Sequence, residues 1–102
     1  MRVTVVRSGG IAGLLMTTTL DTATLDAAAS TTLRELVAAC SFTDRRPTPV
    51  VDGVRVELSV EDDEPHRPAS RVRFDEHDPP EGVERVLNWL GDQPAAQRSV
   101  GR

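Results

Sequence analysis

The sequence predicts an α+β domain in which a four-stranded, largely antiparallel sheet carries two helices, in the order ββαββα. Two pairs of β-rich segments, each followed by a segment with helical periodicity, support this fold class. Apolar and polar residues alternate most regularly over residues 54–61, and helical spacing is clearest over residues 83–90. With 102 residues, the chain is long enough for one domain and too short for two. We expect the domain to span residues 1–91 and the polar stretch 92–102 to form a disordered tail.

The first two strands are predicted at residues 3–7 and 14–20, with a glycine-rich reversal between them. Three glycines in that reversal permit positive φ and a sharp turn: Gly9, Gly10 and Gly13. One face of the second strand presents Leu14, Met16, Thr18 and Leu20, and the other presents Leu15, Thr17 and Thr19. Because a two-stranded hairpin is marginal by itself, this one needs further strands beside it.

The first helix is predicted over about residues 26–41. Its apolar residues recur at the spacing of one helical face, namely Leu33, Leu36, Val37 and Cys40. Asp26 can cap the start of this helix, and Thr22 or Thr24 could do so earlier. The connection that follows, residues 43–53, contains two prolines and ends in Asp-Gly, which predicts an irregular loop.

The second hairpin is predicted to join residues 54–61 to residues 70–75. Four apolar residues of its first strand point toward the core: Val54, Val56, Leu58 and Val60. In its second strand, Val72 and Phe74 point inward and Arg71 and Arg73 point outward, where Glu57 or Glu61 could pair with them.

The last helix is predicted to begin after Asp78-Pro79-Pro80-Glu81, which has the pattern of a capping residue, prolines in the first turn and a glutamate. Its core face consists of Val83, Val86, Leu87 and Leu90, with Trp89 beside that stripe. Gly91 is suited to close the helix.

Composition excludes several classes of function. The formal net charge is −4, and the 12 basic residues, all Arg, form no cluster, which argues against nucleic-acid binding. No apolar run approaches the length of a membrane span or of a signal peptide, so we expect a soluble cytoplasmic protein. A single cysteine excludes an intrachain disulfide framework. We expect a monomer.

No group of residues in the sequence predicts a catalytic site. Cys40 lies on the apolar face of a helix, where a free cysteine behaves as a small hydrophobe. His66 and His77 lack the spacing of metal ligands, and the glycines of residues 9–13 lack the pattern of a phosphate loop. The sequence therefore predicts a protein that is not an enzyme and holds neither a cofactor nor a metal of its own.

Two features have both a structural and a functional interpretation. The acidic run 61–64 is either a solvated turn or a site that binds a cation, although it lacks the alternating ligands of a calcium loop. Leu25, isolated between Thr24 and Asp26, either packs under the start of the helix or anchors a partner protein through an exposed contact.

Several stretches of the chain resemble the emfourin family, small bacterial inhibitors of protealysin-like, thermolysin-type zinc metalloproteases. The most specific is Met1-Arg-Val-Thr-Val-Val-Arg-Ser-Gly-Gly-Ile-Ala-Gly-Leu14. The region Asp21 to Cys40 with Leu33-Arg-Glu-Leu-Val37, the segment Leu58 to Asp62 and the helix Val83 to Leu90 agree with it. The resemblance covers about residues 1–91.

The resemblance implies a thermolysin-like zinc metalloprotease as partner. In such inhibitors one loop offers an aspartate to the catalytic zinc, and a neighbouring region inserts apolar side chains into substrate pockets. In the expected strand order, the second and third strands end at the same end of the sheet. We therefore expect Leu25 to be the apolar anchor, Asp62 or Asp63 to be the zinc ligand, and Asp21 to lie beside them.

Two alternatives stay open. The first uses the opposite end of the sheet, with Ile11 as anchor and Asp44 or Asp52 as ligand. The family usually has Phe where this chain has Ile11, and the acidic turn 61–68 is longer than usual. The second alternative is a protein-binding module without inhibitory activity.

Overall fold

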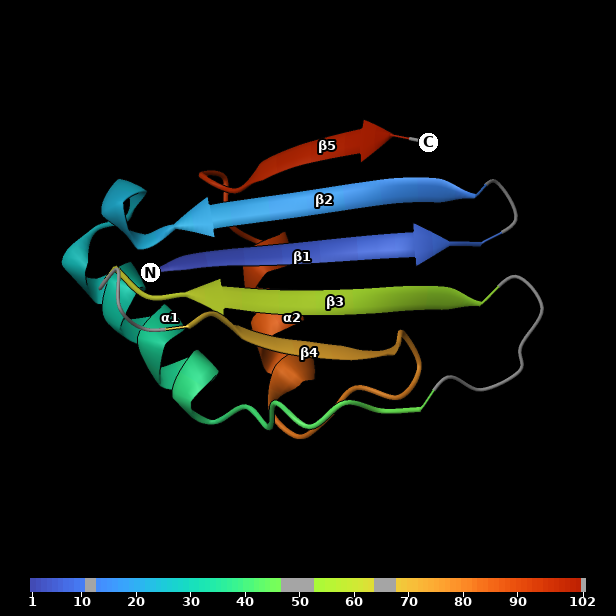
Figure 1. Cartoon of the computed structure of the whole chain (residues 1–102). Helices are drawn as coiled ribbons and strands as arrows, with labels where there is room; N and C mark the ends of the chain where they lie inside the picture. The colour runs from blue at the N-terminus through green and yellow to red at the C-terminus, as the bar shows by residue number, and fades with distance from the viewer. Residues whose placement is uncertain (11–12, 47–52, 64–67, 102) are drawn as a thin grey trace.

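The computed structural model describes residues 1–10, 13–46, 53–63 and 68–101. Within these residues, two helices pack on one face of a five-stranded antiparallel sheet whose order is β4-β3-β1-β2-β5 (Figure 1). The strands are β1 (Arg2–Gly9), β2 (Leu14–Asp21), β3 (Val54–Glu61), β4 (Ser70–Asp75) and β5 (Gln97–Gly101). The helices are the 3-10 helix η1 (Thr22–Thr24), α1 (Ala27–Ala38) and α2 (Val83–Gly91). None of the described helices is long and apolar enough to cross a membrane.

The α+β class and the four predicted strands are confirmed, but the strand count is wrong. A fifth strand, β5, lies within the stretch predicted to be a disordered tail and pairs with the outer edge of β2. All five of its residues are exposed, so they carry no apolar alternation that a sequence pattern could detect. Its Arg98 guanidinium donates to the carbonyls of Leu90 (3.2 Å) and Gly91 (3.0 Å), which ties β5 to the end of α2. Cations near the final carbonyls of a helix are favourable because those carbonyls lack partners within the helix.

The core lies between the sheet and the two helices, and the predicted apolar faces supply it. Its buried members are Val3, Val5, Leu20, Leu33, Val37, Val56, Leu58, Val60, Val72, Phe74, Val83, Val86, Leu90 and Ala96. Leu36, Cys40, Leu87 and Trp89 are partly buried against this cluster, as their positions on the helix faces predict. On the opposite face of the sheet, the predicted pairing of Glu57 with Arg73 is confirmed at 2.9 Å.

The start of α1 is confirmed and the start of α2 is corrected. Asp26 caps α1, and its carboxylate accepts a hydrogen bond from the amide of Ala29 at 2.7 Å. The predicted cap of α2, Asp78, instead donates its amide to the carbonyl of Asp75 at 2.8 Å in the turn that follows β4. The residue at the N-cap of α2 is Gly82, which has a φ of 80° and makes no side-chain capping bond.

Gly82 is required because α2 begins against the end of α1. A Cβ on Gly82 would lie 2.4 Å from the carbonyl oxygen of Ala39, and positive φ already disfavours any side chain there. The amide of Ser41 donates to the carbonyl of Glu81 at 2.8 Å and holds the two segments together. The close approach of the two helices therefore selects a glycine where a capping side chain was expected.

Strand register brings two connections to the same end of the sheet. Arg2 is paired with Asp21 on one side and with Glu61 on the other. Because β2 and β3 are both antiparallel to β1, they end together beside the first residue of β1. The expected proximity of the connection 21–26 to the turn after residue 61 is thus confirmed.

Replacement of Gly82 by alanine should destabilise the domain by about 2–4 kcal/mol, because it adds left-handed backbone strain and a clash with the Ala39 carbonyl. Gly91 is the matched control, since a Cβ there meets nothing within 4 Å. Gly91→Ala should be neutral or stabilising by up to about 1 kcal/mol. Urea denaturation of the two variants measures the difference, and equal stabilities would contradict this account of the helix junction.

Candidate functional site

The candidate site is the end of the sheet where β1 begins and where β2 and β3 end (Figure 1). Met1 lies between the two connections and contacts both. Its carbonyl accepts a hydrogen bond from the amide of Thr22 at 2.9 Å, and its α-amino group donates to the Thr22 hydroxyl at 3.1 Å. Thr22 is only 7% exposed, so these bonds satisfy a polar side chain that folding has buried.

Asp63 joins this cluster from the turn after β3. One carboxylate oxygen pairs with the α-amino group of Met1, and the other lies 3.5 Å from the guanidinium of Arg34 on α1. The α-amino group is the main cause that holds the pKa of the Asp63 carboxyl below its usual value, and Arg34 lowers this pKa further. Asp63 is nevertheless 68% exposed, so these ion pairs are screened by water.

The two neighbouring aspartates shape the turns in which they lie. The Asp62 carboxylate accepts the amide of Asp63 at 2.8 Å, and the side chain is exposed. The Asp21 carboxylate accepts the amide of Ala23 at 3.0 Å and so caps η1, while its other oxygen lies 3.9 Å from the Arg2 guanidinium. The structure therefore brings all three predicted aspartates to one end of the sheet.

Leu25 occupies the short link between η1 and α1. Its amide donates to the carbonyl of Thr22 at 3.1 Å, and its side chain is half-buried against the core. The buried part fits the prediction of a residue that packs under the start of α1. The part that stays exposed lies on the same connection as Asp21.

The alternative site lies at the opposite end of the sheet. Ile11 and Asp52 fall outside the described residues. The carboxylate of Asp44 accepts the amide of Arg73 at 2.9 Å, and the amide of Arg45 donates to the Arg73 carbonyl at 2.9 Å. This segment therefore covers part of the outer edge of β4, and Asp44 serves that contact.

Exposed apolar side chains gather toward that opposite end. Leu15 is 41%, Met16 is 46% and Val100 is 64% exposed, and Met16 pairs with Val100 across β2 and β5. Val100 escaped the sequence analysis because it lies in the stretch assigned to the tail. Residues 97–101 show no alternation of buried and exposed side chains, so only the strand pairing shows that Val100 lies in a strand.

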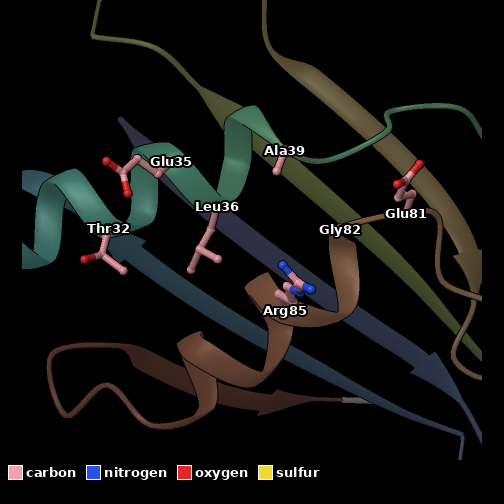
Figure 2. Close-up of a pocket in the computed structure, with 7 residues that line it drawn as sticks. All are labelled: Thr32, Glu35, Leu36, Ala39, Glu81, Gly82 and Arg85. Atoms are coloured by element: carbon pink, nitrogen blue, oxygen red, sulfur yellow. The ribbon is translucent and has the colours of Figure 1, made fainter.

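A separate pocket of about 380 Å³ lies between α1 and α2 (Figure 2). It is lined by Thr32, Glu35, Leu36, Ala39, Glu81, Gly82 and Arg85. None of the predicted site residues lines it. Among the described residues, no group of three or more His, Cys, Asp or Glu side chains could hold a metal ion, here or elsewhere.

Cys40 has the environment of a structural residue. Its side chain is partly buried, its thiol lies 3.3 Å from the Leu36 carbonyl, and burial raises the pKa of this thiol. A raised pKa reduces the fraction of the nucleophilic thiolate at neutral pH.

Comparison with known families settles the classification. The family model of Emfourin matches residues 5–91. The chain belongs to the Emfourin family. Emfourins are protease inhibitors, which is consistent with a protein that is not an enzyme. The match begins within β1 and runs to the end of α2, so it includes the connections at both candidate ends of the sheet and leaves out Met1 and β5. No curated protein and no solved structure matches the chain.

Replacement of Arg34 by glutamine should raise the pKa of Asp63 only part of the way toward its usual value, because the Met1 α-amino group remains. NMR titration of the side-chain carboxyl carbons measures this shift. Arg46→Gln is the control, because Arg46 is exposed and lies away from Asp63. It is next to Arg45, whose carbonyl accepts a hydrogen bond from the Arg55 guanidinium. If the titration of Asp63 is unchanged in Arg34→Gln, the guanidinium does not contribute to the lowered pKa of Asp63.

The same shift predicts the direction of the pH dependence of stability. Because the folded-state pKa of Asp63 is lowered, its ion pairs stabilise the protein above the usual aspartate pKa. That contribution is lost as the pH falls through the lowered value. Arg34→Gln should therefore reduce the difference in unfolding free energy between neutral and strongly acidic pH.

Proposed function

We propose that this emfourin inhibits a thermolysin-like zinc metalloprotease by placing a loop carboxylate on the catalytic zinc and an apolar side chain in a substrate pocket. The family match over residues 5–91 carries the proposal. The position of the connection 21–26 beside the turn at residues 61–63 supports it, because both elements needed for such a block lie at one end of the sheet.

The chemistry of the block follows from the coordination of a catalytic zinc. Such a zinc keeps one position open for the water that attacks the substrate, and a carboxylate oxygen is a competent ligand at ~2.0–2.2 Å. A carboxylate held there excludes the attacking water. The metal belongs to the protease, and the inhibitor supplies only the ligand.

The residues proposed for these roles come from two elements. Asp62 or Asp63 supplies the carboxylate from the turn after β3, and Leu25 supplies the apolar contact from the link between η1 and α1. Asp21 lies beside Leu25 and shapes its connection through the cap of η1. We place the inhibitor in the cytoplasm as a monomer that binds neither nucleic acid nor membrane, a proposal supported by its single cysteine and dispersed arginines.

Inhibition of peptide hydrolysis is the direct test. The protein should inhibit a protealysin- or thermolysin-like protease competitively at micromolar concentration or below, and should leave a serine protease unaffected, because only the former offers a zinc ligand position. A stable complex with undiminished turnover would identify a binding module without inhibitory activity. Absence of both binding and inhibition across such proteases would refute the proposal.

The position of the apolar contact has its own test. Leu25→Ala should raise the inhibition constant by at least about 30-fold, as expected of a residue in a hot spot, while the protein stays folded at the assay temperature. Ile11→Ala, in the alternative anchor between Gly10 and Gly13 of the sequence, should change the inhibition constant by less than about 3-fold. The reverse order would place the interface at the glycine hairpin. A loss of melting temperature that accounts for the whole effect of Leu25→Ala would make Leu25 a packing residue only.

A further inference from the structure

The two edges of the sheet differ in how they are covered. β4 forms one edge, where the Arg73 amide donates to the Asp44 carboxylate and the Arg73 carbonyl accepts the amide of Arg45. β5 forms the other edge, beside β2 (Figure 1). An uncovered edge offers backbone donors and acceptors to another chain, whereas a covered edge does not. Whether β5 can bind a further strand therefore depends on where its backbone groups point.

The direction of the backbone groups in β2 follows from a printed register and one hydrogen bond. The carbonyl of Met1 accepts the amide of Thr22 at 2.9 Å, so Met1 faces β2. Because backbone groups alternate in direction along a strand, Val5 also faces β2, where it is paired with Thr18. Thr17, the neighbour of Thr18, then faces the opposite way, toward β5.

The same alternation continues into β5. Thr17 is paired with Ser99, so Ser99 directs its amide and carbonyl toward β2. Its neighbours Arg98 and Val100 consequently direct theirs toward the outside of the sheet. Among the described residues, neither of these two makes a backbone hydrogen bond to a segment outside the sheet. Two amides and two carbonyls are thus available to an extended chain that runs beside β5.

Exposed apolar side chains accompany this edge. The large exposed apolar residues of the described part of the chain all lie on β2 and β5, namely Leu15, Met16 and Val100. Val100 lies on the same face as Arg98, whose guanidinium reaches the end of α2, and it is paired with Met16. An extended segment beside β5 places every second side chain on that face. An apolar residue there would continue the strip formed by Met16 and Val100.

The β5 edge begins beside the candidate site. Gln97, the first residue of β5, is paired with Thr19, which lies two residues before Asp21. A pocket of about 230 Å³ includes residues of both segments and is lined by Arg2, Thr19, Asp21, Thr24, Ala95 and Gln97. A partner that contacts the connection 21–26 can therefore extend from it along β5.

We propose that β5 is a second contact with the protease, in which an extended segment of the protease adds as a further strand at the outer edge of β5. This contact rests on the proposed function, because it takes the same partner. Main-chain hydrogen bonds to Arg98 and Val100 supply the pairing, and an apolar side chain beside Val100 selects the register. β5 lies outside the family match at residues 5–91, so the contact is additional to the block of the zinc.

Replacement of Val100 by proline tests the backbone pairing, because it removes an outward amide and leaves the amides that face β2. Val100→Pro should raise the inhibition constant by about 10-fold, whereas Val100→Ala, which keeps the amide, should raise it by about 3-fold. Arg71→Pro is the matched control, since Arg71 lies two residues before Arg73 on the opposite edge, and it should leave the inhibition constant unchanged. Exchange of the Ser99 amide, which faces β2, checks that β5 stays in the sheet.

Amide hydrogen exchange on the unmodified protein observes the contact directly. In the complex with a thermolysin-like protease, the amides of Arg98 and Val100 should exchange at least about 10-fold more slowly than in the free inhibitor. The amide of Arg71 should exchange at the same rate in both. If Val100→Pro loses the protection of Ser99, this measurement on the unmodified complex decides.

The outcomes separate this contact from the proposed function. If the unmodified protein inhibits no thermolysin-like protease, the proposed function fails and the contact fails with it. Inhibition without slower exchange at Arg98 and Val100 in the complex would overturn the contact alone. Slower exchange that develops with inhibitor concentration in the absence of protease would assign the edge to a second copy of this chain, and would also overturn the contact.

Discussion

The pairing of β1 with a strand on each side is the constraint on which the rest of the structure depends. All eight residues of β1, from Arg2 to Gly9, are paired with both β2 and β3. Its inward side chains, Val3 and Val5, are 0% and 2% exposed and lie at the centre of the core. Since the central strand is antiparallel to both neighbours, the ends of β2 and β3 must meet beside its first residue.

Polar contacts at that end of the sheet connect the two loops that the strand pairing brings together. Met1 reaches the connection after β2 through Thr22 and the turn after β3 through Asp63. Individually, such exposed contacts stabilise a protein very little. Their effect is on geometry, because they restrain two loops that the proposed inhibition requires at a constant separation.

The helices are placed by a second close approach. α2 begins where the Ala39 carbonyl leaves no room for a side chain on Gly82. From that junction α2 runs across the sheet and ends at the carbonyls that Arg98 binds. The position of β5 thus depends on its pairing with β2 and on the contact of Arg98 with a helix that is fixed at its other end.

The sequence by itself determined the α+β class, four of the strands, the cap at Asp26 and the buried faces, because each is a local pattern of polarity or capping chemistry. Its resemblance to the emfourins is confirmed for the family, and the roles of Leu25, Asp21, Asp62, Asp63 and Ile11 stay predictions. Only the tertiary structure decided the fifth strand, the glycine at the start of α2 and the cluster of polar groups around Met1. Each of these features brings together residues that are distant in the chain. The interactions that select them are backbone pairing at a sheet edge, a steric contact and an ion pair, and these exist only once the sheet and helices have packed.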